Sequence, residues 1–264
     1  MTSSQFESGI YALGLGVKEI AQMTLESYTA LKEMDCVIYL TENKTVGETL
    51  QKLGIEKSTD LSSWYKDGED RAAIYERISS FVVDQSKSHD RVCLLTPGNP
   101  IFLNRVILNL IDRCEAQGIA LHVFPGVSSI DTIMTDLRLP SGEVGVQCFE
   151  ATKFFHDRPN IDTRVPLLLF QPGNFAHSKV QMRMRPTQEQ IAPLTGYLLE
   201  LYPPDSRWIL VGSSGDLGEP PRIMWNYLSE LEQFSELLTI GTLVLPGSWW
   251  PNWLGEVPHS VEST

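Results

Sequence analysis

The first half of the chain alternates short apolar runs with longer segments whose apolar residues recur every three or four positions. The short runs predict buried strands, and the periodic segments predict helices that pack on them. Strands that alternate with helices in this way predict a mostly parallel sheet covered on both faces. The predicted strands are 10–13, 36–40, 91–95 and 121–124, and the predicted helices are 24–34, 71–83, 103–117 and 130–137.

The pattern changes after residue 140, where strand-like runs dominate and one clear helix is predicted over 187–201. We therefore expect a first α/β subdomain at 1–139, a second α/β subdomain at 140–247 and an aromatic C-terminal tail at 248–264. The predicted strands of the second subdomain are 144–149, 165–170, 208–211 and 238–245.

Composition and charge narrow the class of protein. Hydrophobic residues make up 42% of the chain and charged residues 20%, which is typical of a globular protein. The net charge of −12 disfavours nucleic acid as a partner, because a phosphate backbone would be repelled. The apolar runs are too short for a membrane span, and the first residues lack a signal-peptide pattern. We expect a cytoplasmic protein without membrane association.

The cysteines and histidines do not form a metal-binding pattern. Cys36, Cys93, Cys114 and Cys148 are far apart, and the five histidines are scattered. Structural zinc sites need ligands at short, regular spacings. We therefore expect no metal site, and we interpret the cysteines in predicted strands as small buried hydrophobes.

Three loops rich in glycine or serine follow predicted strands. Gly14-Leu-Gly16 follows the first strand, although a dinucleotide fingerprint would require glycine where Glu19 stands. The segments 98–100 and 125–129 follow two further strands, and Ser128 is predicted to cap the next helix. Each loop alone is more often a simple turn. Three of them at the carboxyl ends of strands favour a shared cofactor crevice.

A tyrosine and an arginine share one face of the helix predicted at 71–83. Arg71 and Tyr75 are four residues apart, and Tyr65 precedes them across a short polar loop. A guanidinium beside a phenol stabilises the phenolate and lowers a pKa that starts at roughly 10. Two interpretations remain: a catalytic group, or a surface arginine stacked on tyrosine.

The order of these features resembles the tetrapyrrole methylase superfamily, whose members use S-adenosylmethionine. The resemblance covers roughly residues 9–247 and rests on the early glycine loop, the Gly98-Asn-Pro loop and the Pro125-Gly-Val-Ser loop. It implies two α/β subdomains with the cofactor crevice between them. The superfamily's tetrapyrrole enzymes carry Gly-Pro-Gly followed by Asp-Pro at the first loop, whereas this chain reads Gly14-Leu-Gly-Val-Lys-Glu19.

A more specific resemblance is to the borosin branch, the peptide-backbone α-N-methyltransferases. It rests on the run 147–154, the Asp136-Leu137 pair and the set Tyr65, Arg71 and Tyr75. A phenolate held next to an arginine can serve as the base for such a reaction. We therefore expect Tyr75 to remove the amide proton with Arg71 as its electrostatic partner, and Tyr65 to donate a hydrogen bond to the imidate oxygen. The two tyrosines could exchange these roles.

The resemblance also implies which residues contact the cofactor. Those in the first subdomain are Gly14, Gly16, Pro97, Gly98, Asn99, Ile101, Phe102, Ser128 and Ser129. Those in the second are Gln171, Gly212, Ser213, Gly241 and Thr242.

The resemblance is to the split form of borosin enzymes, which implies a separate precursor peptide bound in trans. It further implies a homodimer, or a heterotetramer with the peptide. Two alternatives stay open: a methyltransferase of this fold that acts on a tetrapyrrole or another small molecule, and a catalytically silent peptide-binding homologue. Pro97 supports the second alternative, because borosin enzymes carry tyrosine at that position.

Overall fold

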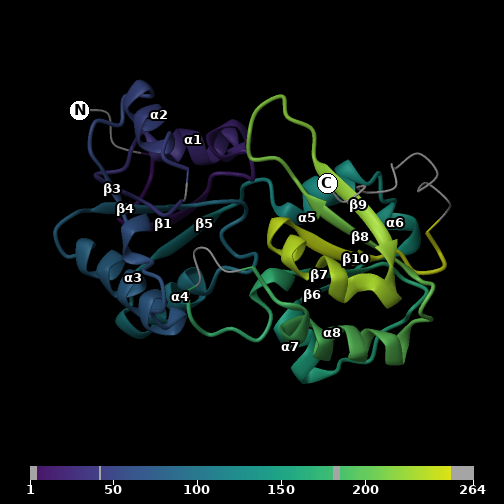
Figure 1. Cartoon of the computed structure of the whole chain (residues 1–264). Helices are drawn as coiled ribbons and strands as arrows, with labels where there is room; N and C mark the ends of the chain where they lie inside the picture. Colours follow the sequence, from purple (N-terminus) through teal and green to yellow (C-terminus); the bar gives the residue numbers. More distant parts are fainter. Residues whose placement is uncertain (1–4, 42, 181–184, 251–264) are drawn as a thin grey trace. The chain divides into compact units, whose positions relative to one another are not determined.

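The computed structural model describes residues 5–41, 43–180 and 185–250, which divide into two compact units. The first unit consists of residues 5–41, 43–131, 178–180 and 215–217. The second consists of residues 132–177, 185–214 and 218–250. Each unit is built on its own five-stranded sheet, with helices packed on it (Figure 1).

The sheet of the first unit is entirely parallel, with strand order β3-β2-β4-β1-β5. The four strands predicted in this half are confirmed. Strand β3 was not predicted, because it is a mostly exposed three-residue edge strand without an apolar run. The strands are β1 (Gly9–Gly14), β2 (Cys36–Tyr39), β3 (Ser58–Asp60), β4 (Arg91–Thr96) and β5 (Leu121–Phe124).

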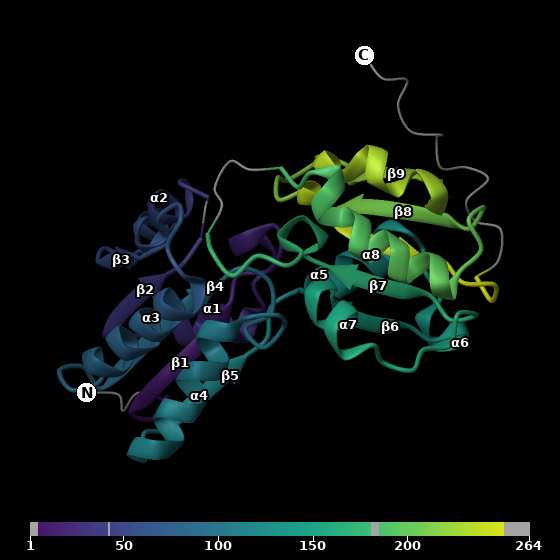
Figure 2. The same cartoon turned by 60° about the horizontal axis from the view of Figure 1, so that its bottom comes forward.

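Helices cover both faces of this sheet. Every residue of β1 is buried; Ile10 and Ala12 belong to one core cluster, and Tyr11 and Leu13 belong to another. The first cluster lies under α3 and α4, which lie side by side in Figures 1 and 2, and the second lies under α1 and α2. The helices are α1 (Leu25–Leu31), α2 (Val46–Lys52), α3 (Arg71–Gln85) and α4 (Arg105–Gln117).

Side chains cap the starts of three helices of the first unit. The side chains of Thr24, Asp70 and Asn104 accept hydrogen bonds from backbone N–H groups in the first turns of α1, α3 and α4. Helix α4 ends at Gly118, whose φ of 67° lies in the left-handed region that glycine tolerates. The three helices were predicted from their apolar periodicity, and the capped starts lie within two residues of the predicted ones. The short helix α2 was missed.

The second unit has a mixed sheet with strand order β6-β7-β10-β8-β9. Only β6 and β7 pair in parallel, and the other neighbours are antiparallel. The strands are β6 (Gln147–Glu150), β7 (Leu167–Phe170), β8 (Arg207–Gly212), β9 (Arg222–Tyr227) and β10 (Thr242–Leu245). The α-helices after β5 are α5 (Ser129–Asp136), α6 (Ser141–Val144), α7 (Ala151–Asp157) and α8 (Gln188–Leu201). The 3₁₀ segments of the chain are η1 (Glu19–Gln22), η2 (Ser62–Trp64), η3 (Pro172–Asn174) and η4 (Leu228–Ile240).

For two strands of this unit, the predicted first residue is wrong. Residues 141–144 form α6 and the chain turns at Gly145, with φ of 72°, so the strand begins only at Gln147. Residues 238–240 belong to η4, and the strand begins at Thr242. Helix α7 and strand β9 were not predicted. Helix α7 directly follows the apolar run of β6, so the sequence pattern did not separate the two. Glu150 marks the boundary, because its side chain caps the first turn of α7.

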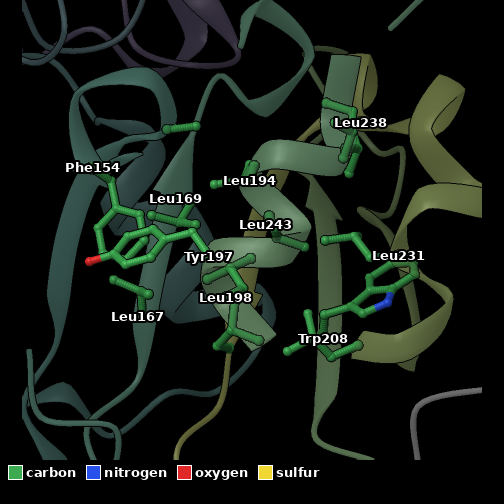
Figure 3. Close-up of a cluster of buried hydrophobic side chains, with 14 of the residues drawn as sticks. Phe154, Leu167, Leu169, Leu194, Tyr197, Leu198, Trp208, Leu231, Leu238 and Leu243 are labelled. Carbon is green, nitrogen blue, oxygen red and sulfur yellow. The ribbon is translucent and has the colours of Figure 1, made fainter. Parts of the chain in front are cut away.

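Helices α7 and α8 and the segment η4 bury one face of the second sheet (Figures 2 and 3). The indole of Trp208 is fully buried in this cluster, and its Nε1–H donates to the Tyr227 carbonyl at 2.9 Å. Helix α8 begins at a capping box of Thr187 and Gln190, at the predicted start of this helix. Of the predicted aromatic tail, residues 251–264 lie outside the described residues.

Replacing Gly196 with alanine is expected to stabilise the protein by about 0.5–1 kcal/mol. Gly196 lies inside α8, and an added Cβ would meet no heavy atom within 4 Å outside the helix's own backbone. The gain comes from the lower backbone entropy of alanine in the unfolded chain. Urea unfolding of both proteins measures it, and an unchanged or lower free energy of unfolding would contradict the open environment of Gly196.

Candidate functional site

Three loops of the first unit meet at the carboxyl ends of its strands. An alanine Cβ at Gly14 would lie 2.4 Å from the Gly126 nitrogen and 2.6 Å from the Gly98 oxygen. The Gly16 N–H donates to the Gly98 oxygen at 3.2 Å, and the Gly98 N–H donates to the Gly16 oxygen at 2.9 Å. The loops after β1, β4 and β5 therefore pack backbone against backbone, and the structure brings the three predicted loops together.

The loop after β4 has space beside it. Gly98 has φ of 66°, and an added Cβ there would meet no described atom within 4 Å. After Pro97 and Gly98, the Asn99 side chain accepts from the Ile101 N–H at 3.0 Å, and the Asn99 carbonyl accepts from the Phe102 N–H at 3.1 Å. Ile101 is 46% exposed. This short turn presents backbone and a partly exposed apolar side chain at the sheet's carboxyl edge.

Ser128 begins α5 as predicted. Its N–H and its hydroxyl both donate to the Asp131 carboxylate at 2.8 Å, and its hydroxyl accepts from the Asp131 N–H at 3.4 Å. The next residue, Ser129, is the first of the helix. This reciprocal capping holds the third loop at a helix start, where N–H groups favour polar ligand atoms.

The residues predicted in the second unit gather at one end of its sheet. Strand β10 pairs Thr242 with Val211 of β8 and Leu243 with Leu169 of β7. Gly241 precedes β10 at the end of the sheet where Gln171 follows β7 and Gly212 ends β8. A Cβ at Gly241 would lie 2.2 Å from the Val211 oxygen, so only glycine fits. The Ser213 hydroxyl donates to the Asp136 carboxylate at 2.6 Å, which fixes the segment after β8.

The structure also brings Tyr65, Arg71 and Tyr75 together. The rings of Tyr65 and Tyr75 have centroids 6.3 Å apart and are tilted by 58°. Arg71 is the first residue of α3, and its charge acts on the Tyr75 phenol, as the helical spacing predicts. Both tyrosines are partly buried and pack against the core cluster under α3 and α4.

The predicted net effect on Tyr75 is wrong in direction. Arg71 does lower the pKa of the Tyr75 phenol, but removal from water raises it by more, so the pKa lies above its ordinary value of 10.0. The sequence shows the nearby charge, whereas burial depends on packing across the whole unit. Tyr75 is therefore a neutral phenol at neutral pH in this state.

A buried carboxyl group that we did not predict lies beside the first loop. Glu19 is only 9% exposed, and its Oε1 accepts a hydrogen bond from the Thr41 hydroxyl. Its φ of 49° is left-handed, which is strained for a residue other than glycine. The signal was present in the sequence, because position 19 is where the dinucleotide fingerprint carries its third glycine.

Replacing Glu19 with glutamine is expected to stabilise the protein more at pH 7 than at pH 4. Burial raises the pKa of the Glu19 carboxyl above its ordinary value of 4.5, so the folded state binds the proton more tightly than the unfolded chain. Stability is therefore lost as pH rises above that ordinary value. Glutamine keeps the shape and does not titrate. Melting temperatures of both proteins between pH 4 and 7 measure the difference, with exposed Glu115→Gln as the control. A pH-independent difference would contradict the raised pKa.

The described residues hold neither a metal-ligand cluster nor a membrane-spanning helix. No group of three or more histidine, cysteine, aspartate or glutamate side chains is placed to hold a metal ion. Within the same residues, no helix combines the length and apolar character needed to cross a lipid bilayer. All four cysteines are free thiols, and burial raises the pKa of the Cys148 thiol to about 11, so it is an unreactive thiol.

The two sheets, with glycine loops packed together at the carboxyl ends of the first, define a two-unit α/β protein. A family model described as "Tetrapyrrole (Corrin/Porphyrin) Methylases" matches residues 9–213. The chain belongs to the tetrapyrrole methylase family.

Curated relatives support the more specific resemblance. The chain is 24% identical over 187 residues to a type I borosin cyclic peptide precursor with a methyltransferase part from Serendipita vermifera subsp. bescii, covering 68% of this chain and 46% of that protein. It is 29% identical over 186 residues to the methyltransferase/omphalotin A precursor of Omphalotus olearius, covering 65% and 41%. The chain thus spans less than half the length of these relatives.

Solved structures share the fold. A uroporphyrin III C-methyltransferase from Thermus thermophilus matches with a TM-score of 0.61 at 18% identity, over 91% of this chain and 92% of that chain. The same kind of enzyme from that organism, complexed with S-adenosyl homocysteine, matches with a TM-score of 0.60 at 18% identity, over 90% and 97%. These matches establish the architecture.

Proposed function

We propose that this protein is an S-adenosylmethionine-dependent methyltransferase that methylates backbone amide nitrogens of a separate precursor peptide. The observation that carries the proposal is the set of Tyr65, Arg71 and Tyr75, which lie close together at the start of α3. The borosin relatives are named as methyltransferases joined to their peptide precursors, which supports the same chemistry here.

The loops of the first unit fit the cofactor. The close packing of Gly14, Gly98 and Gly126 leaves backbone rather than side chains at the carboxyl edge of the sheet. The open space beside Gly98 admits a ligand, and the partly exposed Ile101 offers an apolar contact. In the second unit, Gln171, Ser213 and Thr242 are the polar side chains of the proposed contact set. When bound, S-adenosylmethionine supplies an activated methyl group.

The protein must make an amide nitrogen nucleophilic. Its lone pair is delocalised into the carbonyl group, so the N–H proton has to leave and negative charge develops on the carbonyl oxygen. Tyr75 takes this proton as a phenolate, and the Arg71 guanidinium favours that ionised form. Tyr65 donates a hydrogen bond to the developing imidate oxygen. The exchanged assignment of the two tyrosines uses the same geometry.

The peptide is proposed to bind in trans, although the matched relatives carry their precursor in the same chain. The proposed assembly is a homodimer, or a heterotetramer with two peptides. Light scattering of the purified protein, with and without peptide, measures the mass of the assembly directly. A monomer that methylates peptide at full rate would contradict the dimer.

Mass spectrometry tests the proposed function. The purified protein is incubated with S-adenosylmethionine and separate peptides encoded by small open reading frames beside its gene. Stepwise addition of methyl groups, placed on backbone nitrogens by tandem spectra, is the expected result. Calorimetry with S-adenosyl homocysteine is run in parallel. If the cofactor product binds and every peptide stays unmodified, peptide methylation is contradicted, and a small-molecule substrate or a silent binding protein takes its place.

A further inference from the structure

A short segment from much later in the chain pairs with the turn that leads into α3. We call this segment, Ser178–Val180, the strap. The Gly68 N–H donates to the Val180 carbonyl at 2.9 Å, and the Val180 N–H donates to the Glu69 carbonyl at 2.9 Å. The Arg71 N–H donates to the Ser178 carbonyl at 3.0 Å. Asp70 and Lys179 lie opposite each other as an antiparallel bridge.

The strap completes the start of α3. The first N–H groups of any helix lack partners within the helix. At α3 the Asp70 side chain accepts from the Ala73 N–H at 3.1 Å, and the strap accepts from the Arg71 N–H. The first residue of the helix, which is Arg71, is therefore held by the strap's backbone.

The strap also contributes to the core beneath the tyrosines. The Val180 side chain is 7% exposed and belongs to the same buried cluster as Ile74 and Ile78 of α3. Tyr65 and Tyr75 pack against this cluster from its edge. One residue of the strap thus joins the turn through its N–H and the core through its side chain.

The turn has other anchors besides the strap. The Arg77 guanidinium donates to the Trp64 carbonyl at 2.8 Å, and the Glu69 N–H donates to the Lys66 carbonyl at 3.1 Å. Gly68 has φ of 81° with open space around it, so its own packing does not fix it. The antiparallel pairing with the strap ties the middle of the turn to the unit, alongside the contact of the Glu69 carboxylate with the Arg77 guanidinium at 3.5 Å.

We propose that the strap is a positioning element for the reaction, in which Val180 holds the turn 65–70 so that Tyr65 stays in register with Arg71 and Tyr75. The inference rests on the proposed function for its chemistry. A misplacement of about 1 Å in a reacting group can lower a rate by about 10²-fold. Val180 acts through the tyrosines and does not touch substrate.

Proline substitutions at two neighbouring positions show whether the effect of the strap depends on its hydrogen bonds to the turn. Val180→Pro removes the N–H that bonds Glu69, whereas Lys179→Pro places the same ring at a residue whose N–H points away from the turn. Val180→Ala removes side-chain packing and leaves the backbone bonds in place, whereas Val180→Ile keeps both. We expect Val180→Pro to lower kcat at least about tenfold, with Val180→Ala intermediate and Lys179→Pro and Val180→Ile near wild type. The affinity for S-adenosyl homocysteine should stay unchanged in all four.

Two readouts do not depend on activity. Amide hydrogen exchange at Gly68 and Arg71 should accelerate in Val180→Pro and stay slow in Lys179→Pro. The Tyr75 phenol, followed by NMR of ¹³C-labelled tyrosine and assigned with Tyr75→Phe, should titrate at lower pH in Val180→Pro, because the loosened turn admits water. If Val180→Pro does not fold, kcat, amide exchange and the Tyr75 titration of Val180→Ala, compared with those of Val180→Ile, test the proposal instead.

The outcomes are distinct. A folded Val180→Pro protein with wild-type kcat, exchange and titration overturns the proposal, as does an equal loss of kcat in Lys179→Pro. Loss of cofactor affinity in parallel with kcat also overturns it, because that result marks general unfolding. Absence of methylation in the wild type contradicts the proposed function alone, and the exchange and titration measurements still decide whether the strap holds the turn.

Discussion

Replacing Tyr75 with phenylalanine is expected to lower the rate of peptide methylation by about 10²–10⁴-fold, the usual contribution of a general base. Phenylalanine keeps the ring that packs on the core cluster, so the fold should persist. The affinity for S-adenosyl homocysteine should not change, because the phenol acts on the peptide. Single-turnover rates and calorimetry measure the two quantities. A rate within about threefold of wild type would exclude Tyr75 as the base.

The pH dependence of the same reaction distinguishes a Tyr75 phenolate that acts as the base from a Tyr75 phenol that acts as a hydrogen-bond donor. Because burial holds the Tyr75 pKa above 10.0, the reactive phenolate is scarce at neutral pH and its fraction rises about tenfold per pH unit. The wild-type rate should therefore rise through the alkaline range. Arg71→Ala should lower the rate and move this rise to higher pH. A rate that falls with pH would mean that the phenol acts as a hydrogen-bond donor.

Tyr28→Phe is the matched control for this prediction. Tyr28 also lies on a helix with a cation four residues later, since Lys32 Nζ lies 4.3 Å from its ring centroid. Its phenol is not among the residues proposed to contact substrate or cofactor. We expect Tyr28→Phe to keep wild-type kcat and pH dependence. An equal loss in both variants would show that removing any helix-borne phenol has this effect.

Replacing Gly14 with alanine is expected to lower the affinity for S-adenosyl homocysteine at least about tenfold, equivalent to about 1.4 kcal/mol. The new Cβ would lie 2.4 Å from the Gly126 nitrogen, closer than any real Cβ contact. Backbone atoms cannot rotate away as a flexible side chain can, so the loops after β1 and β5 must separate. Overpacking of this kind also destabilises a protein by about 1–3 kcal/mol. Calorimetry and thermal melting measure the two effects.

Gly196→Ala is the matched control, because it adds the same methyl group where no atom opposes it. That variant should bind S-adenosyl homocysteine like wild type. A Gly14→Ala protein with wild-type affinity and melting temperature would contradict the close approach of the three loops, and with it the cofactor site proposed there.

Much of the fold could be predicted because its signals are local. The three capped helices of the first unit begin with side chains that accept hydrogen bonds from their own first turns, and α4 ends at a left-handed glycine. Strands such as β4 and β7 are continuous apolar runs. The segment 141–149 could not be placed in this way, because a helix turn and a short strand share one apolar stretch that Gly145 divides.

The candidate site also combines features that the sequence predicts with features that it does not. The spacing of Arg71 and Tyr75 placed both on one helix face, and the rule that ligands bind beyond the carboxyl ends of strands selected the three loops. The left-handed backbone at Glu19 and its contact with Thr41 could not be predicted, since they arise between the ends of β1 and β2. The pairing of the strap with the turn before α3 joins residues far apart in the chain.

The sequence by itself determined the alternating α/β pattern, the helix ends, the glycine loops and the tyrosine–arginine face, because each depends on interactions within a few residues. Only the tertiary structure decided that Gly14, Gly98 and Gly126 touch, that Val180 anchors the turn, and that burial outweighs Arg71 at the Tyr75 phenol. Close approach, burial and the pKa of a buried group are sums over neighbours that folding brings from distant parts of the chain.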